Sequence, residues 1–488
     1  MNPLSPDRTA AAVAAVCAAV FFSVSCSETV KCRCQFDCGS WAEEDAAVVE
    51  DSSASPDTAD GSLPDAATPA DGATLPDAGK DGNAVEVVVP TDLPGGDAVV
   101  PDTVVPPAEV VADAAADAAP DVPQPQGPFE FRGIWVTRWD YDSAASVADI
   151  MEEIASLGFN SVMFQVRGNA DAYYASNYEP WAKGLSGTLG KNPGWDPLEV
   201  AVNEAHAHGL EIHAWVNTFV AWTGTSPPPQ SDPPHILYAH PEWRQADKNG
   251  TPMAWNNSYT WVSPGIPEVR QHIQDVVVDI VTGYDVDGLH FDYIRYAGPD
   301  YSHDTWSEQA YAAAKASEPG LGYGDFQRDV LSGFVSDAYQ ALTAARPEVK
   351  VTASVWGIYQ DSFGWGGTSE GYSDYFQDSH RWAQEGYIDA LCPMIYWPLT
   401  SPKGEWTDFA TLVDDHNGAK GDRHLYAGMK ADYATFEEIA DEIAYTRTAG
   451  AEGFVVFSYA TMKDAGYGDD FAATVNAEKA YPPPMPWK

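Results

Sequence analysis

Basic residues are scarce in this chain of 488 residues, which holds 26 Lys and Arg against 72 Asp and Glu. The formal net charge of −46 repels phosphate backbones, and the few bases are not clustered, so we expect no nucleic-acid partner. The acidity has two sources. Residues 43–127 contain 19 acidic residues and one base, Lys80, for a net charge of −18, while residues 128–488 carry −28.

Cysteine is scarce after the first 38 residues, where only Cys392 occurs. The large C-terminal part of the chain therefore has no internal disulfide. Cys32, Cys34 and Cys38 lie close together in KCRCQFDC, but a metal site there would need a fourth ligand and a different spacing. In an exported protein we expect one disulfide with one thiol left over. No EF-hand spacing occurs either, and we expect no metal and no cofactor.

An apolar run, TAAAVAAVCAAVFFSVSC, covers residues 9–26 and follows Arg8. Its length is borderline for a membrane span and small residues lead up to Cys26, which indicates a secretory signal peptide over residues 1–26. Residues 23–26 resemble a bacterial lipobox, although Ser23 stands where leucine is usual. We expect Cys26 to be lipidated and to anchor the protein to a membrane; ordinary secretion without lipidation is the alternative.

Periodic apolar segments begin at Pro128, where β-branched or aromatic runs alternate with helical patterns. Three helical patterns stop at a glycine: 147–157 before Gly158, 197–208 before Gly209 and 267–282 before Gly283. Eight such units predict an α/β fold of the (β/α)8 TIM-barrel type. A doubly wound open sheet is the alternative, but no Gly-rich turn follows the first strand. We expect strands at 132–137, 161–167, 210–217, 288–294, 350–356, 389–397, 423–429 and 453–459.

The segment before this barrel has a composition that cannot form a core. Residues 43–127 are mainly Ala, Asp, Pro and Val, with a loose repeat (SLPDA at 62–66, TLPDA at 74–78), and they read as an extended acidic spacer. We therefore divide the chain into four parts. These are the signal peptide (1–26), a Cys-containing segment and disordered linker (27–127), the barrel domain (128–475) and a Pro-rich C-terminal tail (476–488).

Side-chain alternation predicts which residues point into the barrel, whose active site should lie at the C-terminal strand ends. In the fourth strand, Leu289 and Phe291 should face the helices, whereas His290 and Asp292 face the interior. The same rule selects polar and aromatic residues of three other strands: Gln165, Arg167, His213, Trp215, Asn217, Met394 and Tyr396. Burying polar groups costs free energy unless they are paired, so their convergence at one mouth indicates a functional site.

Each of these polar residues has a structural interpretation beside the functional one. Asp292 suits a catalytic carboxylate or a metal ligand. His290 is either a hydrogen-bonded core histidine or a substrate contact. Arg295 either clamps the substrate or, as we favour, pairs with Asp292. Asn217 and Tyr396, at strand ends, suit the recognition of hydroxyl or amide groups.

Tryptophans are frequent in or beside the expected strand-to-helix loops. Flat aromatic rings with scattered polar groups suit the apolar faces and hydroxyls of sugar rings, which favours an extended carbohydrate groove over a protein interface. The residues concerned are Trp139, Trp181, Trp195, Trp222, Trp255, Trp261, Trp365 and Trp397.

Six stretches of the barrel resemble the glycosyl-hydrolase-like family 10, a group common among bacterial lipoproteins and envelope proteins. They are FRGIWVT (131–137), YYASNYEPWAKGLSGTLGKNPGWDPL (173–198), EAHAHGLEIHAWVN (204–217), SPGIPEVRQHI (263–273), DVDGLHFDYIRYAG (285–298) and IDALCPMIYW (388–397). The resemblance spans most of the barrel in order. It implies a (β/α)8 glycoside hydrolase acting on a bacterial glycan, and one enterobacterial relative looks like a hydrolase of peptidoglycan glycan strands.

The resemblance also implies the catalytic residues, since glycosidases usually use two carboxylates. Asp292 lies in the family's strand-four motif and is the first candidate. Some relatives carry a second Asp directly after it, where this chain has Tyr293. Glu179, in the family's EPW segment, is the expected partner, with Asp171 as its rival and a structural role for Glu179 equally open. The expected substrate-binding residues are Gln165, Arg167, Asp171, Asn217, His290, Arg295, Tyr396 and Trp397.

A second mechanism is suggested by Asp287, Gly288 and Asp292, whose spacing looks like the strand-four motif of family 18 chitinases. Those enzymes use the substrate's N-acetyl group as nucleophile and an acidic residue two positions after the last Asp. Here that position is Ile294, so the acid would come from elsewhere.

The sequence thus predicts an exported, envelope-anchored glycoside hydrolase, monomeric, with a polysaccharide substrate and a lipid anchor in a membrane. Two other classes stay open. One is a non-catalytic glycan-binding lipoprotein that has kept the barrel and lost the chemistry. The other is an adhesive surface protein whose tryptophan-rich loops bind other proteins.

Overall fold

The structure is a computed structural model that describes residues 127–400 and 408–488. The expected signal peptide, Cys26, the group of Cys32, Cys34 and Cys38 and the acidic linker all lie outside the described residues. Within the described ranges, no helix is both long and apolar enough to cross a membrane.

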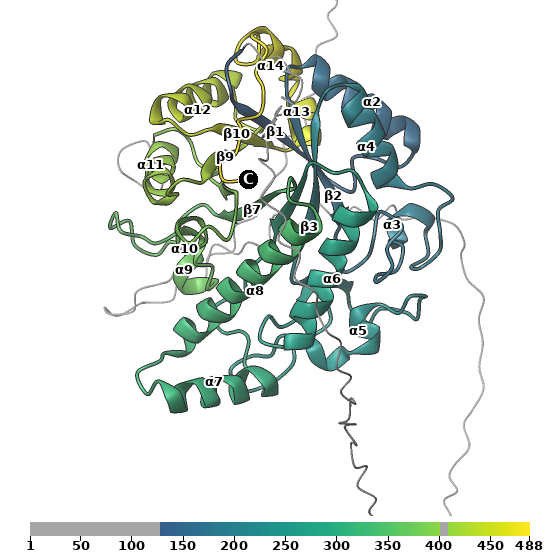
Figure 1. Cartoon of the computed structure of the whole chain (residues 1–488), viewed down its shortest axis with the longest axis vertical. Coiled ribbons are helices and arrows are strands. Elements are labelled where there is room, and N and C mark those ends of the chain that lie inside the picture. The colour runs from purple at the N-terminus through teal and green to yellow at the C-terminus, as the bar shows by residue number, and fades with distance from the viewer. Residues whose placement is uncertain (1–126, 401–407) are drawn as a thin grey trace, which may run out of the picture. The chain divides into compact units, whose positions relative to one another are not determined.

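Eight parallel strands of the described chain close into a barrel, with helices around it (Figure 1). The order around the barrel is β1-β10-β9-β8-β7-β6-β3-β2, which confirms the (β/α)8 fold. The barrel strands are β1 (Phe131–Val136), β2 (Ser161–Arg167), β3 (Glu211–Asn217), β6 (Gly288–Asp292), β7 (Lys350–Trp356), β8 (Ala390–Met394), β9 (His424–Lys430) and β10 (Gly453–Phe457). Each begins and ends within three residues of its predicted strand.

The helices follow the strands along the chain. They are α2 (Ala144–Ser156), α3 (Lys183–Ser186), α4 (Pro197–Ala207), α5 (Ile236–Ala239), the 3-10 helix η2 (Pro241–Trp243), α6 (Pro267–Gly283), α7 (Thr305–Ser317), α8 (Tyr323–Ala345), α9 (Gly371–Asp374), α10 (Ser379–Gln384), α11 (Phe409–Ala419), α12 (Phe436–Ala449), α13 (Tyr459–Ala465) and α14 (Gly468–Ala473). An antiparallel hairpin of β4 (Val220–Gly224) and β5 (Asn256–Trp261), which we did not predict, lies between β3 and α6.

Local sequence signals explain where the helices begin and end. Asp196 caps α4 by accepting hydrogen bonds from the backbone N–H groups of the first turn, and Pro197 is its first residue. Gly158 and Gly209 follow α2 and α4 in left-handed conformations, as predicted. The prediction for Gly283 was wrong: this glycine is the last residue of α6, and Tyr284 ends the helix in an extended conformation.

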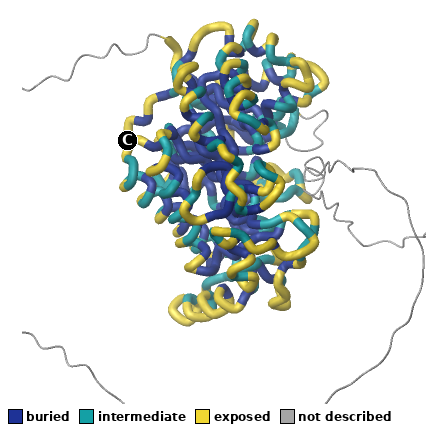
Figure 2. The backbone as a smooth tube through the Cα atoms, turned by 90° about the vertical axis from the view of Figure 1, so that its right-hand side faces the viewer, coloured by how far each residue is buried: buried dark blue, intermediate teal, exposed yellow. Residues whose placement is uncertain are grey.

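Two apolar layers hold the barrel together, and they confirm the predicted alternation. Leu289 and Phe291 pack in the layer between strands and helices, whereas Trp215 belongs to the cluster inside the barrel. That inner cluster comprises Phe131, Trp135, Met163, Trp215, Ala390, Cys392, Tyr426, Val455 and Met485. The buried backbone in the middle of Figure 2 is the barrel, with exposed segments around it.

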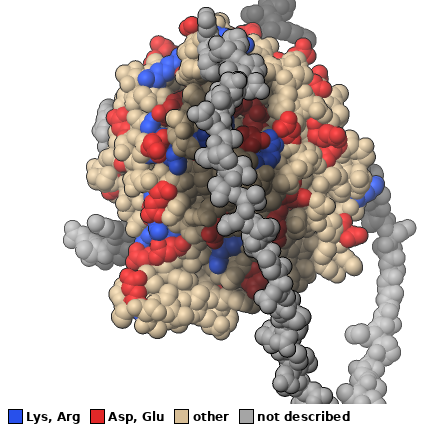
Figure 3. Space-filling model, in the orientation of Figure 1, with Lys and Arg blue, Asp and Glu red and all other residues tan. Residues whose placement is uncertain are grey.

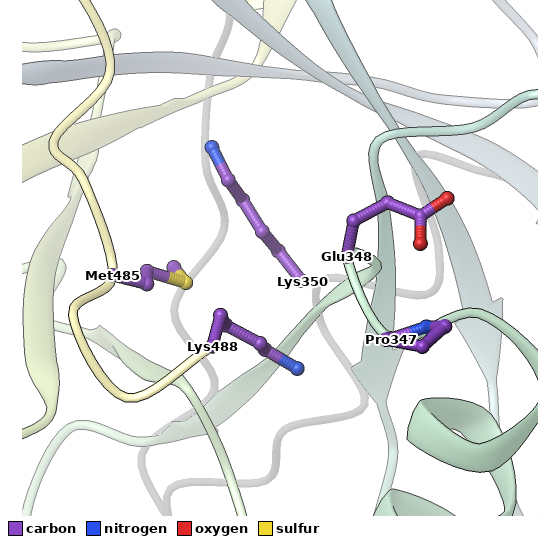
Figure 4. Close-up of a pocket in the computed structure, with 5 residues that line it drawn as sticks. All are labelled: Pro347, Glu348, Lys350, Met485 and Lys488. Atoms are coloured by element: carbon purple, nitrogen blue, oxygen red, sulfur yellow. The ribbon is translucent and has the colours of Figure 1, made fainter. Parts of the chain in front are cut away.

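The base of the barrel, at the N-terminal strand ends, is covered by the last residues of the chain. Met485 inserts into the inner cluster, so the segment expected as a tail is packed. The Trp487 indole donates to Asp389 Oδ1 at 2.7 Å, and Lys488 Nζ lies 2.8 Å from Oδ2 of the same carboxylate. A pocket of about 360 Å³ lies beside this segment, lined by Pro347, Glu348, Lys350, Met485 and Lys488 (Figure 4). It lies at the end of the barrel opposite to the predicted site.

Candidate active site

Asp292 ends β6 at the C-terminal mouth, in register with Asn217 at the end of β3. The residue is only 6 % exposed, and its Oδ1 accepts a hydrogen bond from the Tyr293 backbone N–H at 2.6 Å. Burial raises the pKa of the Asp292 carboxyl above its usual value, and the charge of Arg295 opposes this rise. The Trp215 indole also approaches the carboxylate and favours its charged form, although it makes no hydrogen bond of ordinary geometry.

Arg295 lies beside Asp292 and is surrounded by aromatic rings. Its Nη1 is 3.8 Å from Asp292 Oδ1, so the expected pairing is a long ion pair. The guanidinium carbon lies 4.5 Å from the Tyr293 ring centroid, 5.4 Å from that of Trp356 and 5.8 Å from that of Tyr375. Nη1 is buried and has no hydrogen-bond partner within the described residues. The cation is held by rings while one donor stays unsatisfied.

Asp171 follows β2 in a loop that returns toward the strand end. It is buried, and its Oδ1 accepts from the Asn169 backbone N–H at 2.8 Å. Burial raises the pKa of the Asp171 carboxyl; this backbone bond and the charges of Arg138 and His235 oppose the rise without cancelling it. A buried carboxyl with a raised pKa is suited to donating a proton near neutral pH.

Glu179 lies in the same loop, but both of its oxygens are already bound by neighbouring side chains. Both of its oxygens accept from Arg167, at 2.8 Å from Nε and 2.7 Å from Nη2, and His272 Nε2 lies 3.2 Å from Oε1. Burial disfavours the charged form, but Arg167 and His272 outweigh it and lower the pKa of Glu179 to about 2. The carboxylate therefore stays ionised at neutral pH. This geometry favours the structural interpretation of Glu179 over the catalytic one.

Arg167 joins this loop to the end of β3. Its Nη1 donates to the carbonyl oxygens of Asn217 and Thr218, and the Thr218 N–H in turn donates to the Asp292 carbonyl oxygen at 2.7 Å. Arg167 is fully buried and makes four hydrogen bonds within the chain, two of them from Nε and Nη2 to Glu179, so it is poorly placed to contact a substrate. Arg167 thus connects the loop of Asp171 to the strand ends that carry Asn217 and Asp292.

Gln165 and Asn217 form an amide chain across β2 and β3. Gln165 Oε1 accepts from the Arg138 backbone N–H at 3.1 Å, and its Nε2 donates to Asn217 Oδ1 at 3.2 Å. Asn217 Nδ2 donates to the Gly168 carbonyl oxygen at 3.2 Å. Both amides lie at the mouth, as alternation predicted, and their bonds fix the start of the β1 and β2 loops.

His290 occupies the barrel interior one layer below Asp292. Its Nε2 accepts from the Trp135 indole at 3.0 Å, and its Nδ1 and Nε2 lie 2.8 Å from the hydroxyls of Thr352 and Ser354. Burial lowers the pKa of His290, so the ring is neutral. Its polar atoms are satisfied by the core, which favours the core histidine among the two interpretations.

Tyr396 and Trp397 follow β8 and are half-buried at the mouth. The Tyr396 ring lies 5.7 Å from that of Phe457, and burial, together with the Asp292 charge, raises the pKa of its hydroxyl. Tyr396 is therefore close to Asp292. By contrast, Asp287, the first residue of the chitinase-like motif, precedes β6 at the base, where its Oδ2 accepts from the Ile212 N–H.

The backbone is strained beside both mouth carboxylates. Ala170, directly before Asp171, has φ +51°, and Tyr293, directly after Asp292, has φ +48°. Residues with a Cβ rarely adopt this left-handed conformation, which costs about 1–3 kcal/mol and is concentrated at functional sites. Two of the three left-handed residues other than glycine in the described chain thus adjoin these carboxyls; the third is Phe376.

Arg138 is a mouth residue that the sequence reasoning missed. It follows β1, is 6 % exposed and lies near Asp171 and Tyr259. Alternation gives no register for loop residues, so the pattern could not place its side chain. Its position directly after a barrel strand was the one available signal.

Of the eight loop tryptophans, Trp139 is the only largely exposed one, at 47 %. The Arg138 guanidinium carbon stacks 3.5 Å from the centroid of its ring. The other seven are buried or half-buried, which leaves fewer free rings for the expected groove. On the face drawn in Figure 3, acidic and basic side chains are interspersed.

Comparison with known proteins places the chain in a family. The model of the family "Glycosyl hydrolase-like 10" matches residues 130–442. The glycosyl hydrolase YngK of Bacillus subtilis is 28 % identical over 406 residues, covering 76 % of each chain. The glycosyl hydrolase DigH of Escherichia coli K12 is 27 % identical over 329 residues, covering 60 % of this chain and 72 % of its own.

Among solved structures, the glycoside hydrolase domain of PgaB (BpsB) from Bordetella bronchiseptica has a TM-score of 0.49 at 12 % identity, covering 70 % of this chain and 98 % of its own. The match of the family model to nearly two thirds of the chain confirms the resemblance that the sequence motifs carried. The chain belongs to the glycosyl hydrolase-like 10 family and is a glycoside hydrolase with a carbohydrate substrate.

Proposed function

We propose that this glycoside hydrolase cleaves a bacterial polysaccharide, either peptidoglycan glycan strands or a related exported glycan, by carboxylate acid/base catalysis at the β2/β6 mouth. One observation carries the proposal. Asp171 and Asp292 are buried carboxyls at the C-terminal ends of strands on either side of β3, and both have a raised pKa. Glycosidases need one carboxyl that donates a proton and one that stays anionic.

The surroundings of the two carboxyls suggest how the roles divide. Asp292 has Arg295 at 3.8 Å and a backbone N–H at 2.6 Å, which both favour its anionic form, so it serves as the nucleophile or base. Asp171 lacks an ion pair of 4.0 Å or less within the described residues, and its raised pKa suits the general acid. Glu179, the expected partner, is replaced by Asp171 in this proposal because its pKa is lowered to about 2.

Unsatisfied donors at the same mouth support a ligand that is rich in oxygen atoms. Arg138 Nη1, Trp215 Nε1 and Arg295 Nη1 are buried without a partner in the described part of the chain. Buried donors are nearly always paired in proteins, so a bound sugar with its hydroxyl and ring oxygens would complete them. Asn217, Tyr396 and Trp397 are the further contacts we assign, whereas Gln165, Arg167 and His290 serve the protein's own packing.

The cellular setting belongs to the proposal and rests on the sequence. The run at residues 9–26 and Cys26 support export with a lipid anchor, and the acidic residues 43–127 support a spacer between membrane and barrel. A monomeric, envelope-anchored enzyme would then reach a glycan some distance from its membrane. Radiolabelled palmitate incorporation into the parent but not into Cys26→Ala tests the anchor.

A second candidate function is a glycan-binding lipoprotein without turnover. Tyr293 favours it, because it stands where some relatives have a second Asp, and its ring lies against Arg295. A substrate-assisted mechanism has less support: Asp287 lies at the base, and Ile294 occupies the position of the acid.

Reducing-end release from purified glycan strands separates these candidates. We expect Asp292→Asn to lower kcat by roughly 10²- to 10⁴-fold, because it removes the anionic carboxylate, while circular dichroism shows an intact fold. Cleavage by the variant at the parent's rate would remove Asp292 from the mechanism. Tight binding by the parent without any release of reducing ends would favour the binding protein instead.

A further inference from the structure

Arg138 is a buried cation whose charge is left without a close partner. The only hydrogen bond of its guanidinium within the described residues runs from Nη2 to the Tyr259 hydroxyl, at 3.4 Å. Nη1 has no hydrogen-bond partner there, and the neighbouring Asp171 acts on the guanidinium through its charge. Burial alone would lower the pKa of Arg138, but its surroundings raise it overall, and an arginine side chain is cationic at any physiological pH.

Burying a guanidinium without a hydrogen-bonded anion costs free energy unless a bound ligand compensates the charge. Removing one partner of a buried ion pair strongly destabilises a protein, because a bare charge is left in a medium of low dielectric. The ring of Trp139 offsets part of this cost through a cation–π contact at 3.5 Å. A bound anion would compensate the rest of the free-energy cost of burying the Arg138 charge.

The neighbours of Arg138 hold the guanidinium in place rather than letting it swing to solvent. A Cβ on Gly168 would lie 2.6 Å from Arg138 Nε, so the absence of a side chain at Gly168 makes room for the guanidinium. Trp139 covers it from the other side and is itself 47 % exposed. The result is a fixed donor beneath an exposed aromatic ring, close to Asp171.

We propose that Arg138 and Trp139 form a subsite for a sugar that carries a carboxylate, with Nη1 of Arg138 donating to the carboxylate and Trp139 packing against the ring. This rests on the proposed glycan function and narrows its substrate class to acidic glycans. A guanidinium matches the planar geometry of a carboxylate, and such charge-assisted bonds are about twice as strong as neutral ones. A sugar hydroxyl would satisfy the hydrogen bond but leave the charge uncompensated.

The overall acidity of the protein does not oppose this subsite at short range. Residues 128–488 carry a net charge of −28, which repels an anionic polymer at a distance. At physiological ionic strength that repulsion is screened over about 8 Å, whereas a contact with a buried guanidinium is screened much less. A substrate carboxylate here would also keep a proton on the neighbouring Asp171, since two anions in one buried site repel each other.

The test compares two ligands that differ only in charge. Acidic glycan strands and the same strands with their carboxylates reduced to primary alcohols are titrated into the parent protein by calorimetry. We expect the parent to bind the acidic strands roughly tenfold or more tightly, as befits a charge-assisted hydrogen bond. Equal affinity for both forms, or no binding of the acidic form, would overturn the subsite. This comparison needs no variant and therefore no assumption about folding.

Three variants then assign the preference to the residue. Arg138→Gln should bind the acidic and the reduced strands with equal affinity. Arg138→Lys should keep part of the preference for the acidic strands, because lysine keeps the positive charge but lacks the planar guanidinium. Gly168→Ala should lose the preference although Arg138 is still present, since the added Cβ displaces the guanidinium. A full preference retained by Arg138→Gln would overturn the assignment. Binding of acidic strands without any cleavage would contradict the proposed hydrolysis but leave the subsite standing.

Discussion

The two ends of the barrel contain the same kind of ion pair in different settings. At the base, Glu130 accepts from Arg132 Nε and Arg447 Nε, each at 2.6 Å. At the mouth, Glu179 accepts from Arg167 in the same bidentate manner. Both carboxylates are buried, and their pairing lowers the pKa of each against the effect of burial. Paired carboxylates of this kind stabilise the fold wherever they lie.

The two ends of the barrel differ in the residues that surround each ion pair. The base is closed by the last residues of the chain, with Trp487 and Lys488 bound to the buried Asp389. The mouth contains two carboxyls with a raised pKa and left-handed residues beside both of them, whereas unsatisfied polar atoms occur at both ends, for example Arg138 Nη1 at the mouth and Arg423 Nε at the base. A buried carboxyl with a raised pKa next to a strained residue is therefore a better guide to a candidate site than charge, burial or unsatisfied polar atoms alone.

The largest expected effect is on stability, and it allows a direct comparison of the ion pairs of Glu130 and Glu179. Glu130→Gln leaves Arg132 and Arg447, and Glu179→Gln leaves Arg167, without an anionic partner. We expect each variant to lower the free energy of unfolding by about 3–5 kcal/mol. At urea concentrations well below the unfolding midpoint, only Glu179→Gln should also lower kcat, and by less than about tenfold, because Arg167 links the Asp171 loop to the end of β3 but takes no part in the chemistry. Urea unfolding and reducing-end assays measure the two effects. Equal activity of the two variants would break the comparison.

A smaller effect concerns Glu442 of α12, which packs near Tyr433 of the loop after β9. Burial raises the pKa of this carboxyl to about 9, far above its usual value. The unfolded chain loses the proton at the usual carboxyl pKa while the folded protein keeps it, so stability falls as the pH rises through this window. The glutamine of Glu442→Gln does not titrate, so this variant lacks that loss of stability with rising pH.

We therefore expect Glu442→Gln to be more stable than the parent at pH 8, by an amount on the order of a few kcal/mol, and to show a flatter dependence of stability on pH. Thermal unfolding of both proteins between pH 5 and pH 8 measures this. A parent whose stability does not fall over that range would contradict a protonated Glu442.

The smallest effect is on the pH profile. Arg295 lowers the pKa of Asp292, against the rise that burial causes. Arg295→Met keeps much of the apolar stem but removes this charge, so the pKa of Asp292 should rise and the acidic limb of kcat/KM should move to higher pH. An unchanged acidic limb would mean that Asp292 is not the group that must be ionised.

Residues on regular strands could be placed from the sequence. In β6, alternation alone put His290 and Asp292 inside and Leu289 and Phe291 outside, because the period of a strand is two. The same rule placed Gln165 and Asn217 at the mouth. Alternation does not predict hydrogen-bond partners. The hydrogen bonds that identify His290 as a core residue therefore could not be predicted from the sequence.

Loop residues could not be placed in this way. Glu179 and Arg167 are twelve residues apart, and the turn that brings them together has no periodic signature, so Glu179 looked like a free carboxylate. Arg138 was overlooked for the same reason. The final PPPMPWK segment looked like a tail because prolines interrupt any pattern, yet Met485 packs inside the barrel.

The most direct test of the account replaces the Glu179 pair without leaving a bare charge. Exchanging both partners of a buried pair for apolar residues is often neutral for stability, so Arg167→Met with Glu179→Leu should fold. We predict that this double variant keeps kcat/KM for glycan strands within about tenfold of the parent, whereas Asp171→Asn loses roughly 10²-fold or more. An inactive, folded double variant beside an active Asp171→Asn would show that Glu179 is the catalytic partner of Asp292.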